Sequence, residues 1–381
     1  MIGSKGIPAA YGGFETFVDK LTERKHSDKL VYHVSCWGQD NKHFVYNDAK
    51  CYNIKMPNIG PAKAIYGDVV AMHRAIRACK TAGVTPYICL MACRMGPFVG
   101  YFKRQIEKMG GFLYVNPDGH EWKRSKWSAP VRAYWKISER LTVKHADYLI
   151  CDSRGIEEYI QTEYAQYHPQ TTFIAYGSEF STGDYTDEEC GYTAWCREHG
   201  LTPGQYYLNV GRFVPENNYE AIIREFIKSG SEKDLVIITT ENKKFYDRLE
   251  KKYHFSGNPH IKFVGTVYDS RLLQRIREKA FASIHGHSVG GTNPSLVEAL
   301  GTSDLNLLYA VKFNQEVALD TAMYWDTTEG SLADLMQKAE QMPEAEIKEL
   351  GQKAHKRVAD AYNWELITRA YENVFLNWKK A

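Results

Sequence analysis

The sequence predicts an α/β protein with two doubly wound, Rossmann-like domains. Its length of 381 residues is more than one hydrophobic core usually serves. Short β-branched or aromatic runs alternate with longer helical segments, which is typical of parallel sheets flanked by helices. The alternation occurs in two successive series, so we expect two domains. Each should bind its ligands at the carboxyl ends of its strands.

The first series is expected to form the N-terminal domain. It opens with Met1–Ser4, which resembles the end of a strand running into its loop. The strands predicted after it are Leu30–Cys36, Tyr87–Leu90, Gly111–Val115, Tyr148–Cys151 and Thr172–Ala175. Helices are predicted at Ala64–Lys80 and Val131–His145.

The second series is expected to form the C-terminal domain. Its predicted strands are Tyr206–Val210, Leu235–Thr239, Ile261–Val264, Phe281–Ile284 and Leu305–Leu308, and its helices include Tyr219–Ser229 and Ser270–Lys279. The polar stretch 178–205 shows no clear strand, so we interpret it as the connection between the domains. The predicted divisions are residues 1–178, 179–361 and a terminal helix over 362–381.

Composition indicates a cytoplasmic protein. The 44% hydrophobic and 25% charged residues are ordinary for a globular chain. No apolar run is long enough for a spanning helix, and the N-terminus lacks the pattern of a secretory signal. Eight cysteines are scattered along the sequence, and Cys89 and Cys93 form the one close pair. We therefore expect reduced thiols and no zinc site.

The net charge is near neutral, but the charged residues are distributed unevenly along the chain. Residues 1–154 hold 24 Lys/Arg and 13 Asp/Glu, whereas the remainder holds 24 and 33. A basic N-terminal half favours an anionic partner, either a phosphate-bearing substrate or an anionic membrane surface. Nucleic acid is not expected, because no DNA- or RNA-binding motif accompanies the charge.

A glycine-rich segment, G-S-K-G-I-P-A-A-Y-G-G-F-E, spans residues 3–15 and leads into a helix expected to begin near Gly13. Glycine lets the backbone approach an anion, and a helix N-terminus presents unpaired N–H groups to it. The spacing fits neither the dinucleotide pattern nor the P-loop. An anion-binding loop and an ordinary tight turn are both compatible with these residues.

A second motif, N-P-D-G-H-E-W-K-R over residues 116–124, follows a predicted strand directly. Ionisable side chains beside a glycine turn at the carboxyl end of a strand are typical of an α/β site. A lone histidine is usually structural, but His120 stands among two acidic and two basic residues. We predict a functional role for His120.

A third motif, G-R-F-V-P-E over residues 211–216, follows the first strand of the second series. Arg212 could form two hydrogen bonds to a diphosphate and stabilise charge on a leaving group. The alternative is a surface ion pair between Arg212 and Glu216.

The fourth motif covers residues 285–300, with Gly290-Gly291-Thr292-Asn293 leading into a helix that has Pro294 in its first turn. It offers a second helix N-terminus to a phosphate. Glu298, one turn inside, could accept hydrogen bonds from a sugar hydroxyl. His285 and His287 lack a third ligand nearby in the sequence, so we do not expect a metal.

These four motifs resemble glycosyltransferase family 4, and within it the rhamnosyltransferases that build bacterial capsule or cell-wall polysaccharide. Residues 3–16 follow the subgroup pattern G-[ST]-[KR]-G-I-P-A-x-Y-G-G-F-E-T, and 116–124 and 287–299 are similar to it. The resemblance extends to Tyr362–Glu365. It implies the GT-B fold, in which two Rossmann-like domains face each other across a cleft and a terminal helix crosses back to the first domain.

The resemblance also implies residue roles. His120 would lie at the sugar-reacting centre, Arg212 would bind the diphosphate, and Glu298 would hold the ribose. The other donor contacts it implies are Gly12, Gly13, Gly291, Thr292 and Asn293.

Two positions depart from the family pattern. The family commonly has lysine where this chain has Asn217, and glutamate where it has Gly290. Lys5 or Arg94 could replace the missing cation. An enzyme for a deoxy-sugar could tolerate the missing carboxylate, which agrees with rhamnose.

The resemblance implies a retaining hexosyltransferase that needs no metal or other cofactor, specifically a β-1,4-L-rhamnosyltransferase. It would move L-rhamnose from dTDP-L-rhamnose to a polyprenyl-diphosphate-linked sugar. The alternatives are a UDP-hexose donor on the same scaffold, a catalytically inactive nucleotide-sugar binder, and a nucleotide-sugar epimerase of similar fold.

A basic, tryptophan-flanked helix is expected to carry the acceptor or membrane surface. Its cations are Lys123, Arg124, Lys126, Arg132, Lys136, Arg140 and Lys144, and the last four recur every four positions. Such a helix suits an anionic membrane or the diphosphate of a lipid-linked sugar. It could equally be a solvated helix face. With the resemblance, it predicts peripheral association with the inner face of the plasma membrane.

Overall fold

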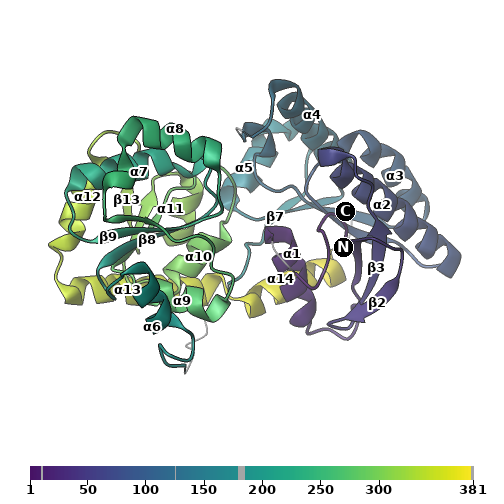
Figure 1. The fold of residues 1–381 in the computed structure, drawn as a ribbon. Coiled ribbons are helices and arrows are strands. Elements are labelled where there is room, and N and C mark those ends of the chain that lie inside the picture. The colour runs from purple at the N-terminus through teal and green to yellow at the C-terminus, as the bar shows by residue number, and fades with distance from the viewer. Residues whose placement is uncertain (10–11, 125, 179–184, 379–381) are drawn as a thin grey trace. The chain divides into compact units, whose positions relative to one another are not determined.

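The computed structural model describes residues 1–9, 12–124, 126–178 and 185–378. The chain divides into two compact units (Figure 1). Unit 1 comprises Met1–Gly177 and Trp364–Ala381, and unit 2 comprises Ser178–Asn363.

Unit 1 contains two sheets. The first is parallel, in the order β4 (Tyr87–Met91), β5 (Phe112–Asn116), β6 (Tyr148–Cys151) and β7 (Thr171–Phe173). In the second, β3 (Ala49–Lys55) lies between β1 (His33–Gly38), to which it is parallel, and β2 (His43–Tyr46), to which it is antiparallel.

The first two residues of the chain connect these sheets. Ile2 donates a hydrogen bond of 2.9 Å to the Cys89 oxygen and accepts one of 2.7 Å from the Met91 amide, both on β4. On the other side, the Met1 oxygen accepts a bond of 3.2 Å from the Ser35 amide of β1. Residues 1–2 therefore pair like the end of a strand, as their sequence suggested.

The helices of unit 1 begin and end where local chemistry favours it. Pro97 and Pro130 stand in the first turns of α3 and α4, and the Ser153 side chain caps α5. Gly83 ends α2 in the left-handed conformation. The elements are α1 (Gly13–Glu23), α2 (Lys63–Ala82), α3 (Gly96–Lys108), α4 (Ala129–His145), α5 (Arg154–Glu163) and α14 (Trp364–Asn377), with short 3₁₀ turns at Gly60–Ala62, Glu121–Lys123 and Ala165–Tyr167.

The last helix packs onto the first one. Figure 1 shows α14 (yellow) beside α1 (purple), and the Phe17 and Tyr371 rings are 4.9 Å apart. The Glu372 carboxylate accepts hydrogen bonds from the amides of His26 and Ser27, just after α1. Tyr371 is fully buried, so α14 is part of the core of unit 1.

Unit 2 is a doubly wound domain with one six-stranded parallel sheet. Counted along the chain, its strand order is 3-2-1-4-5-6, as in dinucleotide-binding folds. The strands across the sheet are β10 (Ile261–Phe263), β9 (Asp234–Ile238), β8 (Tyr206–Val210), β11 (Ala282–His285), β12 (Asn306–Tyr309) and β13 (Met323–Trp325).

Helices surround this sheet, and several carry side-chain caps. Asn242 caps α8, Asp269 caps α9 and Asn293 caps α10. The elements are α6 (Tyr192–His199), α7 (Tyr219–Ser229), α8 (Lys243–Tyr253), α9 (Ser270–Glu278), α10 (Pro294–Leu300), α11 (Lys312–Ala318), α12 (Ser331–Glu340) and α13 (Glu344–Ala361), with 3₁₀ turns at Pro215–Asn217 and Phe255–Gly257.

All ten predicted strands are present, with shifts of up to three residues at their ends. The predictions missed β2, β3 and β13, which are short or rich in polar residues. The interpretation of 178–205 as a connection was wrong in part. Within it, α6 packs Tyr192 and Trp195 into a core of unit 2. Among the described residues, every helix is too short or too polar to cross a lipid bilayer.

Candidate functional site

The glycine-rich loop of unit 1 is held by three charged side chains. The Arg94 guanidinium donates to the Gly3 oxygen, and Arg94 also pairs with Asp68 at 2.7 Å. The Glu15 carboxylate accepts a hydrogen bond of 2.7 Å from the Lys5 amide. Asp19 accepts one of the same length from the Ala9 amide. The loop is thus tied to its surroundings on both sides of Gly6; residues 10 and 11 lie outside the described ranges.

Arg94 is a less suitable replacement cation than the sequence suggested. Its guanidinium is engaged by the buried Asp68 carboxylate and the Gly3 oxygen, and its side chain is only 16% exposed. Burial raises the pKa of Asp68 to about 6, against the opposing effect of Arg94. Arg94 therefore shapes the loop, whereas the side chain of Lys5 is exposed.

The two glycines before α1 differ in what surrounds them. Gly12 has a φ of 131°, and a Cβ there would lie 1.8 Å from a carboxylate oxygen of Glu15. Glycine is therefore required at position 12. A Cβ on Gly13 would meet no described atom within 4 Å apart from its chain neighbours and the backbone of α1. The space in front of Gly13 suits a close contact with a ligand.

His120 lies in an aromatic setting after β5. Its ring is 4.3 Å from that of Tyr159 and 5.9 Å from that of Trp122, measured between centroids. Burial, helped by the nearby charges of Lys123 and Lys136, lowers the pKa of His120 to about 4. The imidazole is therefore neutral at physiological pH and can donate and accept one hydrogen bond each.

The acidic residues around His120 are already engaged. Glu121 pairs with Arg124 and with Lys126, the latter at 2.7 Å, and accepts a bond of 2.9 Å from the Trp127 indole. Asp118 has a left-handed backbone and accepts from the Gly119 amide. Burial raises the pKa of Asp118.

Two of the cations predicted for the acceptor or membrane surface are engaged by neighbouring side chains. The Lys136 ammonium lies 4.7 Å from the Trp122 ring centroid and 5.0 Å from those of Tyr159 and Tyr164, and it pairs with Glu163 at 2.7 Å. Arg124 is likewise paired. The side chains of Lys123, Arg132, Arg140 and Lys144 are exposed, and the described part of the structure records no ion pair for them.

In unit 2, Arg212 projects from the loop that follows β8. Its side chain is exposed, and within the described ranges it forms no ion pair with Glu216 or any other residue. The loop beneath it is fixed, because the Asn217 amide donates a hydrogen bond of 2.8 Å to the Arg212 oxygen. Asn217 is only 4% exposed. It therefore holds the loop in shape at the position where the family commonly has lysine.

Three further amide side chains fix β11 and the turn after it. Asn209 donates to the Ile284 oxygen and Asn218 to the Gly286 oxygen, each at 2.8 Å. Asn314 donates to the His287 oxygen at 3.1 Å. None of these residues was predicted from the sequence, which has no pattern linking them. They make the carboxyl edge of the sheet rigid at β8 and β11.

Two histidines stack at this edge. The rings of His285 and His287 are 4.3 Å apart and nearly parallel, at 11°. Burial, together with the nearby charge of Arg277, lowers the pKa of His285 to about 3. Its Nε2 atom has no hydrogen-bond partner among the described residues.

The remaining predicted donor residues lie at the start of α10. Thr292 is 3% exposed, and Gly291 before it is also buried. Asn293 uses its side-chain oxygen to accept a bond of 2.9 Å from the Ser295 amide. Glu298 pairs with Arg277 at 2.6 Å, a partner that the sequence did not suggest, and remains 40% exposed. The described residues contain no group of three metal-ligating side chains.

Comparisons with known proteins identify the fold. Residues 1–179 match a family model described as a domain of unknown function, DUF1972. No curated protein matches the sequence. Among solved structures, sucrose-phosphate synthase from Thermosynechococcus elongatus matches with a TM-score of 0.73 and 16% identity, over 96% of this chain and 93% of that one.

Trehalose-6-phosphate synthases are similar as well. One matches with a TM-score of 0.74 and 11% identity, over 100% of this chain and 99% of that one. The E. coli protein bound with UDP-2-fluoro glucose matches with a TM-score of 0.70 and 11% identity, over 99% of each chain. These likenesses show that the chain has the GT-B fold, as its sequence predicted.

Proposed function

We propose that this GT-B protein is a retaining glycosyltransferase that moves L-rhamnose from dTDP-L-rhamnose to a polyprenyl-diphosphate-linked sugar in bacterial surface polysaccharide synthesis. One observation carries the proposal. Arg212 is an exposed cation without an ion pair among the described residues, on a rigid loop at the carboxyl end of β8. This is the edge of a doubly wound sheet at which ligands bind.

Unit 2 would bind the nucleotide-sugar donor. Arg212 would hold the diphosphate and stabilise the charge that grows on it as the sugar leaves. Gly291, Thr292 and Asn293 would contribute loop contacts, and Glu298 would accept a hydrogen bond from the ribose. That a matching synthase crystallised with a UDP-sugar supports nucleotide-sugar binding.

The transfer would break the bond from C1 of the sugar to the diphosphate and form one to the acceptor oxygen on the same face. The acceptor's hydroxyl proton would pass to the leaving diphosphate. Retention is proposed because a matching trehalose-6-phosphate synthase was studied for glycosyl transfer with retention. In this scheme, stabilisation of the leaving group supplies most of the catalysis.

Unit 1 would contribute His120 and the loop before α1. A neutral imidazole can hydrogen-bond a sugar hydroxyl without adding charge beside an oxocarbenium-like sugar. Gly12 and Gly13 would contact the donor, and the exposed cations Lys123, Arg132 and Arg140 would lie toward an anionic acceptor or membrane.

Rhamnose is proposed because of Gly290. It stands where the family commonly has a glutamate, and a Cβ there would meet no atom of the described residues within 4 Å. A sugar lacking a hydroxyl needs fewer polar contacts. The same feature is compatible with the second candidate, a nucleotide-sugar binder without activity, because it also removes a functional carboxylate.

The test is product formation from a short-chain lipid diphosphate-sugar, with chelator present. The donors dTDP-L-rhamnose, UDP-glucose, UDP-galactose and UDP-N-acetylglucosamine are offered separately. Turnover with dTDP-L-rhamnose and with none of the other donors would support the proposed donor and the proposed acceptor class. Because chelator is present, it would also support metal independence. Turnover with a UDP-sugar would overturn the rhamnose assignment, and nucleotide binding without turnover would favour the inactive binder.

A further inference from the structure

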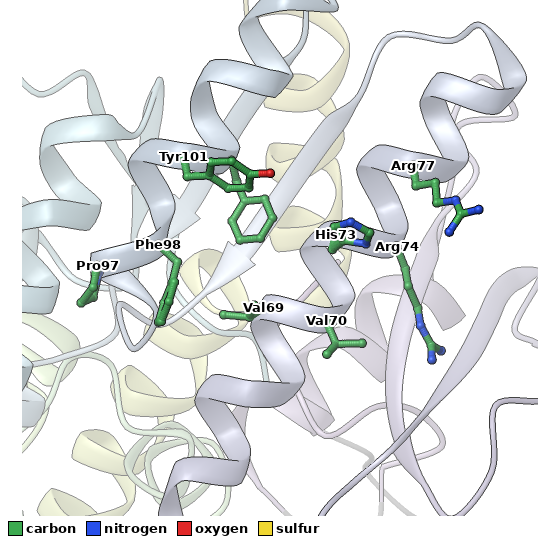
Figure 2. Close-up of a pocket in the computed structure, with 9 residues that line it drawn as sticks. Val69, Val70, His73, Arg74, Arg77, Pro97, Phe98 and Tyr101 are labelled. Atoms are coloured by element: carbon green, nitrogen blue, oxygen red, sulfur yellow. The ribbon is translucent and has the colours of Figure 1, made fainter.

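A groove of about 570 Å³ runs between α2 and α3 of unit 1 (Figure 2). It lies outside every motif discussed above. Figure 2 shows Val69 and His73 on α2 facing Phe98 and Tyr101 on α3. The full lining is Val69, Val70, His73, Arg74, Arg77, Pro97, Phe98, Tyr101 and Phe102.

The floor of the groove is apolar and open to solvent. Tyr101 is 63% exposed and Phe98 45% exposed, whereas Phe102 behind them is buried. Two exposed aromatic side chains beside Val69 and Val70 form a continuous apolar surface, and such surfaces on a folded chain commonly mark a binding site. The tyrosine adds a hydroxyl at the outer edge, which suits the boundary between a lipid and water.

The rim of the groove is cationic. Arg77 is exposed and has no ion pair in the part of the chain that the structure describes. Arg74 donates to neutral acceptors, the Asn53 oxygen at 3.0 Å and the Asn41 side chain at 2.7 Å, so its charge is not neutralised by them. The sequence of α2 has one acidic residue, Asp68, which is buried against Arg94. The groove therefore presents positive charge beside an apolar floor.

We propose that this groove binds an anionic membrane lipid, with its hydrocarbon chain on Phe98 and Tyr101 and its phosphate at Arg77. An apolar floor alone would also suit a protein partner. The uncompensated arginines favour an amphiphile whose head carries negative charge. The groove is then a lipid-binding surface of unit 1 in addition to the exposed cations of α4. The inference rests on the proposed function only in that a lipid-linked acceptor places the enzyme at a membrane.

The test is sedimentation of the full chain with vesicles, in the absence of any donor. Vesicles of phosphatidylcholine containing phosphatidylglycerol are compared with vesicles of phosphatidylcholine alone. We expect binding to the anionic vesicles. Phe98→Ser with Tyr101→Ser should weaken it about tenfold through lost apolar contact. Arg77→Ala should weaken it about fivefold.

Matched controls lie in unit 2. Tyr268→Ser removes a tyrosine that is 76% exposed, and Arg197→Ala removes an exposed arginine; both should bind vesicles like the parent chain. Thermal unfolding of each variant checks that folding is intact. Groove variants that bind as well as the controls would overturn the proposal.

Calorimetry with soluble probes separates the possible occupants. Farnesyl phosphate should bind, and inorganic phosphate should bind at least tenfold more weakly; equal binding would overturn a lipid site. If the chain self-associates, and the groove variants abolish that association without changing vesicle binding, the groove is an interface between copies instead. Vesicle binding without sugar transfer would refute the proposed function and leave this inference standing.

Discussion

The side-chain amide of Asn217 donates a hydrogen bond of 2.8 Å to the main-chain oxygen of Arg212, five residues earlier. This contact closes the loop from which the Arg212 guanidinium projects. A buried, neutral residue therefore supports an exposed cation, at a position where the family that the sequence resembles commonly has a second cation. The loop's geometry depends on a hydrogen bond instead of on charge.

Replacing Asn217 should loosen the loop. Asn217→Ala leaves a buried carbonyl without its donor and should lower the free energy of unfolding by about 1–3 kcal/mol. Asn217→Asp keeps the shape of the side chain but removes its N–H donor and buries a charge. It should therefore lower the free energy of unfolding by at least as much. Chemical denaturation measures both. Parent-like stability in both variants would show that the hydrogen bond does not hold the loop.

Arg212→Ala should lower turnover about a hundredfold or more, because a preorganised cation on the leaving diphosphate would be lost. Stability should change little, since the side chain is exposed. Steady-state kinetics with the active donor measures the effect. Arg197→Ala, which removes another exposed arginine of unit 2, is the control. Near-parent turnover in Arg212→Ala would show that this arginine does not stabilise the leaving diphosphate.

Gly12→Ala and Gly13→Ala should behave differently. The first forces a methyl group against the Glu15 carboxylate at a φ of 131° and should cost about 1–3 kcal/mol. The Lys5 amide donates a hydrogen bond to Glu15, so hydrogen exchange at this amide should become faster when the loop opens. The methyl group of Gly13→Ala meets open space, so stability should be unchanged. Donor affinity should nevertheless fall in Gly13→Ala if a ligand occupies that space.

His120 should act as a neutral side chain. Because its pKa is lowered to about 4, it gains a proton only as the pH falls through that value. The acid limb of kcat/KM due to His120 should lie near pH 4, whereas an unperturbed histidine would place it near 6.5. The pH–rate profile of the parent and of His120→Gln, which lacks the titrating group, tests this expectation.

His120→Ala should reduce transfer about a hundredfold and leave nucleotide binding largely intact. Equilibrium binding of the nucleoside diphosphate, measured beside turnover, separates the two. Loss of nucleotide binding would place the role of this histidine elsewhere.

Replacing Lys136 and replacing Arg140 should change the stability of the protein by different amounts, although both residues stand on α4. Lys136→Ala removes the cation that lies over three aromatic rings and beside Glu139, which is 5% exposed, and should cost about 1–3 kcal/mol. Arg140→Ala removes an exposed side chain and should stay within about 0.5 kcal/mol. Thermal unfolding of the two variants compares them. Equal effects would contradict a structural role for Lys136.

The sequence predicted the fold well because periodicity and turn residues act locally. The strand Tyr206–Val210 and the helix Tyr219–Ser229 were predicted to the residue, since most of the side chains that each buries are apolar. β3 was missed because Lys50 and Asn53 interrupt its apolar residues, and β2 was missed because it has only four residues. Such strands form through pairing with neighbours that a single sequence does not show.

The site was predicted less completely, because its supporting contacts join distant residues. The positions of His120 and Arg212 followed from motifs at strand ends. No pattern in the sequence predicts that Tyr159 packs on His120 or that Asn314 donates a hydrogen bond to His287. Lys136 was placed on the right helix, but its aromatic partners come from the turn before α4 and from α5 with the residue that ends it. Spacing along one helix cannot reveal them.

The placement of α14 has a consequence for how the protein is made. Unit 1 is built from both ends of the chain, and Tyr371 and Trp364 are buried within it. During synthesis the ribosome releases residues 1–177 long before it reaches α14. The core around Phe17 therefore stays exposed on one side while all of unit 2 is translated and can fold. Because α14 is translated after unit 2, it completes a core whose other residues were made before unit 2.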